Sequence, residues 1–182
     1  MATVIALTGS PSARSRTAAL SEHIALRLQA AGHQVATVRV RDLPADALLA
    51  ADAKNPAIAE VVAAIEAADG LVVASPVYKA AYSGVLKTLL DLLPQHALTG
   101  KIVLPVVTGG TEVHVLALDY ALRPVLTSLG AHHVVKGCFV LDRHITLEPE
   151  GIALDPAGAE KLHAAVDVFA DVLGARHLLA EV

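Results

Sequence analysis

Five short strand-like runs, rich in apolar residues, alternate with stretches of helical spacing and constrain the fold of this chain strongly. Apolar runs of this length are typical of parallel strands that helices cover on both faces. Connections between such strands are right-handed. We therefore expect an α/β fold, a doubly wound five-stranded parallel sheet, with strands at Val4–Leu7, Gln34–Val40, Leu71–Ala74, Ile102–Val107 and Val134–Val140.

Helix signals fill the gaps between these runs. Leu20, Ile24 and Leu28 recur every four residues, and Gly32 follows as a helix end. Helices are also expected after the N-cap pair Asn55-Pro56, at Ser83–Leu93, at Val113–Leu129 and after Asp155-Pro156.

Two segments break the regular pattern. Pro105 lies inside a predicted strand, and because proline donates no hydrogen bond we expect a bulge or local irregularity there. The segment Arg143–Leu154 shows the least regular pattern and is expected to be mobile. Neither segment looks like a linker, so residues 1–182 are predicted to form a single domain.

Composition excludes several classes of protein. Apolar residues make up 54% of the chain and charged residues 18%, which excludes a disordered segment. The apolar runs are far shorter than the roughly 18 residues that a membrane span needs. A net charge of -4 gives no general reason to bind nucleic acid. No basic flank precedes the first apolar run, so we expect no signal peptide and a cytoplasmic location.

Cysteine and histidine offer little chemistry. The single cysteine, Cys138, lies in a strand-like run and is expected to be a buried, unreactive thiol. The chain has nine histidines but no HxxxH or CxxC spacing, and His132 and His133 are adjacent, so they would point to opposite faces of a strand. No metal site is predicted.

The turn after the first predicted strand is the richest in chemistry. Its serines, threonines and arginines stand where a helix N-terminus exposes free N–H groups, a combination that suits a phosphate. Neither a GxGxxG nor a GxxxxGK[ST] motif is present. A low-molecular-weight phosphatase would need a cysteine in this turn, and the turn has none. The candidate residues are Ser10, Ser12, Arg14, Ser15, Arg16 and Thr17.

Two more loops should leave the sheet at the same edge, because the carboxyl ends of parallel strands meet there. One follows the third strand as Ser75-Pro76-Val77-Tyr78-Lys79, a proline-stiffened turn with an aromatic ring and an ammonium group. The other is Thr108-Gly109-Gly110-Thr111, whose glycines let backbone N–H groups approach a planar ring. A phosphate cradle, an apolar platform and a glycine loop together suit the phosphate and the two ring edges of a flavin mononucleotide.

Three segments carry a family resemblance: Pro76–Gly84, Leu86–Pro94 and Thr108–Thr111. They resemble the NADPH-dependent FMN reductases, in particular the reductase component of two-component alkanesulfonate monooxygenase systems. The resemblance implies a flavodoxin-like fold with strand order 2-1-3-4-5. It also implies FMN and NADPH as the small molecules bound, a homo-oligomer, dimer or tetramer, and transfer of reduced FMN to an FMNH2-dependent monooxygenase.

The resemblance also assigns residues. Ser10, Ser15, Arg16 and Thr17 match phosphate-binding positions, Pro76, Val77, Tyr78 and Lys79 match the second loop, and Thr108, Gly109, Gly110 and Thr111 match the isoalloxazine loop. Wider members of the superfamily often carry arginine where this chain has Ser12, and Arg14 or Arg16 is the available replacement.

Tyr120 matches an inserted tyrosine that, in the sulfonate-linked reductases, creates a π-bulge at the tetramer interface and accompanies exchangeable flavin. Pro124 supports the irregularity independently, because it has no N–H to pair with the carbonyl of Tyr120.

Two other functions remain open. One is an FMN-retaining quinone, azo-dye or metal-ion reductase of the same fold. The other is a flavodoxin-type electron carrier, although such carriers tend to be more strongly acidic. Hydride transfer from NADPH to flavin needs position more than side-chain acid–base chemistry, so no catalytic acid is assigned.

Overall fold

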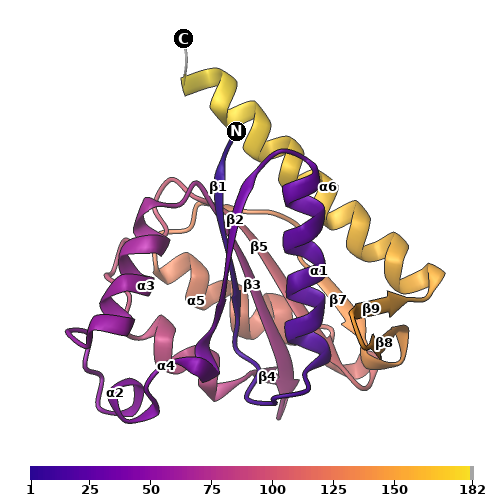
Figure 1. Cartoon of the computed structure of the whole chain (residues 1–182), viewed down its shortest axis with the longest axis horizontal. Coiled ribbons are helices and arrows are strands. Elements are labelled where there is room, and N and C mark those ends of the chain that lie inside the picture. The colour runs from indigo at the N-terminus through magenta and orange to yellow at the C-terminus, as the bar shows by residue number, and fades with distance from the viewer. Residues whose placement is uncertain (181–182) are drawn as a thin grey trace.

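The computed structural model describes the backbone of residues 1–180 and the side chains up to residue 175; the last two residues of the predicted domain lie outside this range. Its centre is a twisted sheet in the order β2-β1-β3-β5, with β6 and β7 both beside β5 (Figure 1). The strands of this sheet are β1 (Thr3–Thr8), β2 (Gln34–Arg39), β3 (Gly70–Tyr78), β4 (Ala81–Tyr82), β5 (Ile102–Gly109), β6 (His133–Val134) and β7 (Cys138–Leu141).

The predicted order 2-1-3-4-5 is confirmed when β6 and β7 are counted as one interrupted strand, and all pairings except that of β4 are parallel. The interruption lies opposite Pro105. Val103 pairs with Val134 and Val106 pairs with Cys138, so three residues on one strand face two on the other. The irregularity expected at Pro105 therefore falls in its neighbour, while the pairing of β5 with β3 is unbroken.

Helices cover both faces of the sheet. α1 and α6 lie on one side in Figure 1, and α3, α4 and α5 lie on the other with the short α2. The helices are α1 (Arg16–Ala30), α2 (Ala45–Leu49), α3 (Pro56–Ala67), α4 (Gly84–Leu90), α5 (Arg123–Ser128) and α6 (Pro156–Ala180), with 3-10 turns at Val40–Asp42, Glu112–His114 and Asp142–His144 and a π-helix at Leu118–Leu122.

The caps read from the sequence are present. The side chain of Asn55 accepts a hydrogen bond from the N–H of Ala57 (3.1 Å), and that of Asp155 accepts one from the N–H of Gly158 (2.8 Å). Such caps satisfy donors that a helix start leaves unpaired. In the described residues, none of the helices combines the length and the apolar character that crossing a membrane requires.

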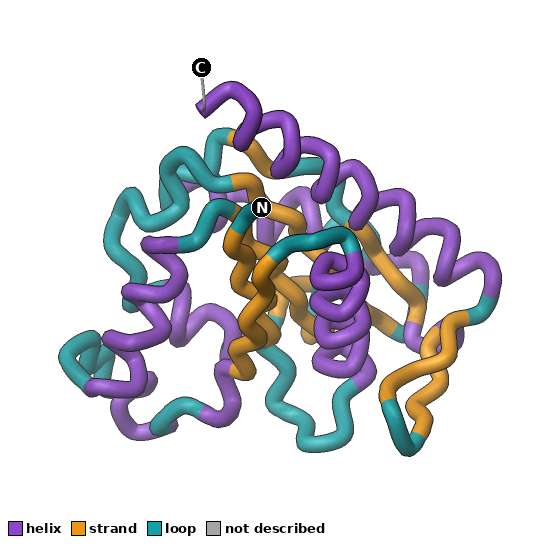
Figure 2. The backbone as a smooth tube through the Cα atoms, turned by 45° about the horizontal axis from the view of Figure 1, so that its top comes forward, coloured by secondary structure: helices purple, strands orange, loops and turns teal. Residues whose placement is uncertain are grey.

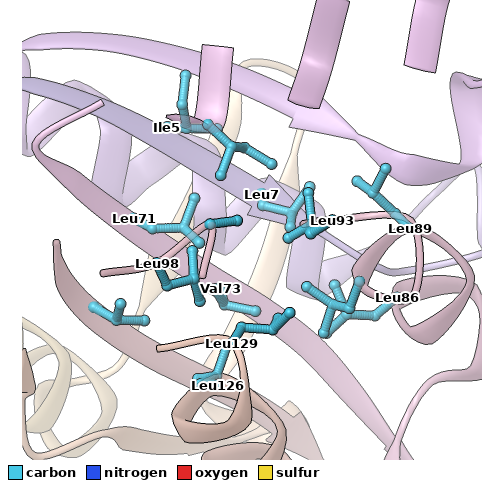
Figure 3. Close-up of a cluster of buried hydrophobic side chains, with 14 of the residues drawn as sticks. Ile5, Leu7, Leu71, Val73, Leu86, Leu89, Leu93, Leu98, Leu126 and Leu129 are labelled. Carbon is cyan, nitrogen blue, oxygen red and sulfur yellow. The ribbon is translucent and has the colours of Figure 1, made fainter. Parts of the chain in front are cut away.

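Two apolar clusters hold the layers together. In the first, Leu7, Leu71 and Val73 from the strands face leucines of α4 and α5 (Figure 3). In the second, alternate strand residues face Leu20 of α1 and Phe169 of α6, both fully buried. Burying one such side chain contributes about 1.5–3 kcal/mol, so these clusters fix the sheet edge that carries the candidate site.

The prediction that Arg143–Leu154 is mobile is wrong. Residues Ile145–Glu148 (β8) and Gly151–Leu154 (β9) form an antiparallel hairpin beside α1 and the start of α6 (Figure 2). Ile145 is buried, and Ile152 and Leu154 pack against the second cluster. The hairpin is ordered by contacts that are distant in sequence, which local pattern does not reveal.

The helix predicted at Val113–Leu129 is not continuous. A 3-10 turn comes first, then the π-helix, and only Arg123–Ser128 is α-helical. The N–H of Arg123 donates to the carbonyl of Leu118, five residues back. Pro124 removes a donor that a regular helix would use, which explains the widening beside Tyr120.

A histidine pair joins α1 to α6. The Nε2 atoms of His23 and His163 lie 3.2 Å apart, with their ring planes within 13° of parallel. A hydrogen bond between two imidazole nitrogens needs one N–H and one lone pair, so it is lost when both nitrogens carry protons. Burial, with His163 and Arg27 nearby, lowers the pKa of His23 below its usual 6.5.

This pair predicts an acid-sensitive contact. As the pH falls below 6.5, His23 takes up a proton more readily in the unfolded chain than in the folded chain. The free energy of unfolding therefore falls, because the stabilisation that neutral His23 contributes at pH 7 is lost. We expect His23→Gln to flatten the fall in the free energy of unfolding between pH 7.5 and 5.5, measured by urea denaturation. His96→Gln, at an exposed position, is the control. An unchanged slope in His23→Gln would contradict the assignment.

Candidate functional site

The three loops predicted to carry chemistry leave the same edge of the sheet, at the lower end of β1, β3 and β5 in Figure 1. Printed contacts tie them together. The N–H of Gly9 donates to the carbonyl of Ala74 (2.9 Å), and the hydroxyls of Thr17 and Thr108 share a hydrogen bond of 2.6 Å. The first loop therefore touches the strands that lead into the second and third.

The first loop presents hydroxyls around the start of α1. Ser15 is the N-cap, and its Oγ accepts from the N–H of Ala18 (3.0 Å). Ser10 is buried, and its Oγ accepts a long hydrogen bond from the N–H of Ser12 (3.4 Å). The Oγ of Ser12 donates to the carbonyl of Arg14 (2.9 Å), which folds the exposed part of the loop back on itself.

Charge in this loop is unbalanced. Arg16 is the first residue of α1, and the first turn contains no acidic residue. Among the arginines whose side chains are described, Arg14 and Arg16 are the two without a carboxylate partner; the paired ones are Arg27, Arg39, Arg41, Arg123 and Arg143. Cations at a helix N-terminus oppose the helix dipole, so this arrangement favours a bound anion.

The second segment is not the proline turn that was predicted. Pro76, Val77 and Tyr78 continue β3, and Val77 and Tyr78 pair with Tyr82 and Ala81 of β4. Lys79 and Ala80 form the two-residue turn of this hairpin, both with positive φ (51° and 64°). The hairpin leaves the ring of Tyr78 half exposed at the sheet edge.

The third segment begins inside β5, which includes Thr108 and Gly109. A Cβ at Gly109 would lie 3.1 Å from the ring of Phe139, so this glycine allows close packing within the protein. A Cβ at Gly110 would meet nothing within 4 Å. Open space therefore adjoins the backbone of Gly110, where the sequence predicted the approach of a planar ring.

The donor set fits a flavin mononucleotide. Thr8, at the end of β1, has a buried hydroxyl with no hydrogen-bond partner among the described residues. The uncompensated arginines suit the phosphate, the open side of Gly110 suits a ring edge, and Tyr78 at the end of β3 offers a half-exposed ring at the same edge of the sheet. The unpartnered hydroxyl and the uncompensated charges are unfavourable in the protein alone, and they are compatible with a ligand of this kind.

Ser75 and Ser83 were not predicted to be site residues, yet their hydrogen bonds hold the first loop against α4. The Oγ of Ser83 donates to the carbonyl of Gly9 (2.5 Å) and accepts from the N–H of Leu86 as the N-cap of α4. The Oγ of Ser75 accepts from the N–H of Ser83 (2.8 Å). A Ser-Gly pair before a helix is a recognisable cap, but its bond to Gly9 spans 74 residues.

Gly9 itself is required by packing. A Cβ there would lie 2.3 Å from the Cβ of Leu86, closer than side chains tolerate. The first loop therefore sits directly on α4, and the Ser83 bond fixes its position.

Beside the second segment lies an apolar surface, here called the Tyr120 surface: Val113, Leu116, Ala117, Tyr120 and Ala121. With Ala80 and His114 these residues line a shallow hollow. Tyr120 is 79% exposed and Val113 is 82% exposed. The surface joins the π-helix to the β3–β4 turn.

Other candidate chemistry is limited. Cys138 is buried, and burial raises the pKa of its thiol to about 11, so it is not a nucleophile at neutral pH. In the part of the chain with described side chains, no three His, Cys, Asp or Glu residues are arranged to hold a metal ion.

Comparison with known proteins shows the family of this chain. A family model described as NADPH-dependent FMN reductase matches residues 2–145. An FMN reductase (NADPH) of Pseudomonas putida is 46% identical over 95% of this chain and 89% of its own. One of Escherichia coli is 42% identical over 95% and 91%.

A solved structure, the apo form of the NADH:FMN oxidoreductase EmoB, superposes with a TM-score of 0.87 at 44% identity, covering 93% of this chain and 89% of the other. Fold and site together define a flavodoxin-like flavoprotein. The chain belongs to the NADPH-dependent FMN reductase family, oxidoreductases that use FMN and NADPH.

The two hydrogen bonds of the Ser83 hydroxyl, to Gly9 and Leu86, give a stability prediction. Ser83→Ala removes a helix cap and leaves the buried carbonyl of Gly9 without this donor, which should lower the free energy of unfolding by about 1–3 kcal/mol in urea denaturation. Ser128→Ala is the control, because Ser128 is exposed and bonds only within its own helix region; its effect should stay within about 0.5 kcal/mol. Equal effects of the two substitutions would show that Ser83 is an ordinary cap.

Proposed function

We propose that this protein reduces free FMN with NADPH and passes the reduced flavin to a separate FMNH2-dependent monooxygenase that acts on sulfonates. The observation that carries the site is the pair of uncompensated arginines at the N-terminus of α1, at the edge where all three loops meet. The partner rests on the sequence resemblance to sulfonate-linked reductases. The single cysteine fits a reducing compartment, and we propose the cytoplasm as the place of the reaction.

Each loop has a proposed role. Ser10, Ser12, Arg14, Ser15, Arg16 and Thr17 bind the phosphate. The second segment, Pro76, Val77, Tyr78 and Lys79, would hold the apolar edge of the ring. Thr108, Gly109, Gly110 and Thr111 would hold the pyrimidine edge, and their backbone donors would stabilise negative charge there.

When bound, FMN supplies the hydride acceptor, and the nicotinamide supplies the hydride. The protein contributes position: oriented reactants remove up to roughly 7–11 kcal/mol of a barrier. No side chain is assigned as a catalytic acid or base. The proposed donor is NADPH, although the similar EmoB structure is described as an NADH:FMN oxidoreductase.

Steady-state kinetics test this function. We expect NADPH oxidation that saturates with added free FMN, from a protein that purifies colourless, with NADH as the comparison donor. A yellow protein that reduces quinones, azo dyes or metal ions without added flavin would favour the FMN-retaining alternative. A protein that accepts no electrons from either nicotinamide would favour a flavodoxin-type carrier.

We further propose that the Tyr120 surface is a subunit contact, in a dimer or tetramer, and that the widened helix keeps the flavin exchangeable. The exposure of Val113, Leu116 and Tyr120 supports a contact, because apolar surface of this kind is commonly covered. Its position against Ala80, next to Lys79, supports a link to the flavin site.

Deleting Tyr120 tests the link. Removing one residue should restore a regular helical register, tighten flavin binding and give a yellow protein that has lost steady-state transfer of FMN, while single-turnover reduction by NADPH persists. Light scattering at micromolar concentration should report a smaller assembly than the wild type. Tyr120→Ala, which keeps the extra residue, should show a weaker form of the same change. A deletion variant that remains folded, colourless, fully active and unchanged in assembly would contradict the proposal.

A further inference from the structure

The hairpin β8–β9 lies against the helix that begins at the phosphate loop. Ile145 is 2% exposed and belongs to the same apolar cluster as Leu20 and Ile24 of α1. Figure 2 shows the hairpin beside the end of α1 that follows the loop. The hairpin is therefore a neighbour of the site, although it begins where the match to the family model ends, at residue 145.

Polar contacts close the base of the hairpin. His144 Nδ1 lies 2.5 Å from Asp155 Oδ2, and the N–H of Asp155 donates to the carbonyl of His144 (3.2 Å). The other oxygen of Asp155 accepts from the N–H of Gly158 at the start of α6. A Cβ at Gly158 would lie 2.8 Å from the Cβ of His144, so helix and hairpin base are in tight contact.

One bond leads from this base to the phosphate loop. Arg16 Nε donates to the carbonyl of Ile145 (3.1 Å), a residue 129 positions away. Arg16 makes no other hydrogen bond within the described residues, so the remaining four N–H groups of its guanidinium are available to a ligand. A backbone carbonyl carries no net charge. The bond thus holds the side chain in place and leaves its positive charge uncompensated.

A carboxylate would position the same arginine but would neutralise it. Arg27, on the same helix, shows that alternative: its Nη2 donates to both carboxylate oxygens of Asp167 (2.7 and 3.0 Å). Holding Arg16 by a neutral group suits an anion site. Fixing a long side chain before the ligand arrives also reduces the entropy lost on binding.

We propose that the hairpin Ile145–Leu154 is a positioning element for the FMN phosphate, with the Ile145 carbonyl as its contact and the His144–Asp155 pair as its brace. Arg16 touches the phosphate, and Ile145, His144 and Asp155 act through Arg16. The inference rests on the proposed phosphate loop. By linkage, a bound phosphate stabilises the hairpin to the same extent that the hairpin strengthens phosphate binding.

Binding of FMN and riboflavin separates this role from a merely structural one, because riboflavin lacks the phosphate. Arg16→Lys keeps a charge but loses the planar fork that reaches both the carbonyl and the phosphate. We expect its Kd for FMN to rise on the order of tenfold, with the Kd for riboflavin changing less than about twofold. Arg27→Lys, an equivalent substitution on the same helix, is the control and should leave both values unchanged.

A double-mutant cycle tests the brace. His144→Ala should weaken FMN severalfold and spare riboflavin, and it should have no further effect when combined with Arg16→Lys. Equal weakening of both flavins by His144→Ala, or additive effects with Arg16→Lys, would overturn the proposal.

Hydrogen exchange on the unaltered protein gives a second measurement, should His144→Ala fail to fold. FMN should slow exchange of the amides of residues 146–153, and riboflavin should not. Equal protection by both flavins, or none by FMN, would overturn the inference. If wild type binds FMN no better than riboflavin, the phosphate loop itself fails; if only Arg16→Lys discriminates the flavins, the loop stands and the hairpin role fails.

Discussion

The contact of the first loop with α4 is the constraint on which the rest of the site depends. Gly9 lies so close to Leu86 that no side chain fits between them, and Ser83 holds the Gly9 carbonyl while it caps the same helix. Ser75, which precedes the second segment in β3, joins this junction by accepting a hydrogen bond from the backbone N–H of Ser83. Because these hydrogen bonds and contacts join loop, strand and helix, the first loop is held against β3 and α4 by the protein itself.

This edge of the sheet also carries unpaired positive charge. Most described arginines are paired with carboxylates, which balances their charge and contributes little to stability at a surface. Arg14 and Arg16 are the exceptions, and they stand at a helix N-terminus, where positive charge is least favourable. Among the described arginines this unfavourable placement occurs at the start of α1 alone, and it is the feature on which the proposed anion site rests.

Two prolines illustrate how a local rule has different consequences in different surroundings. Pro105 leaves the pairing of its own strand with β3 unbroken and shifts the irregularity into the neighbouring strand, between β6 and β7. Pro124 changes its own element instead, and the turn before it widens to a π-helix that presents Tyr120 to solvent. In a sheet, the strand beside a proline can break its pairing while the proline's own strand stays regular. In a helix, the hydrogen bonds of the same element must rearrange.

Local sequence determined the elements that depend on neighbouring residues. The strand runs, the caps at Asn55 and Asp155 and the widened turn before Pro124 follow from periodicity, capping and a missing N–H, all set within a few residues. The edge where the loops meet also follows, since parallel strands share their carboxyl ends. Tertiary structure alone decided the hairpin Ile145–Leu154, the continuation of β3 through Tyr78 and the bonds of Ser83 to Gly9 and of Arg16 to Ile145. The residues that make these contacts lie far apart in the chain, or are held in place by packing against other elements. No local pattern encodes which distant carbonyl a serine or an arginine will bind.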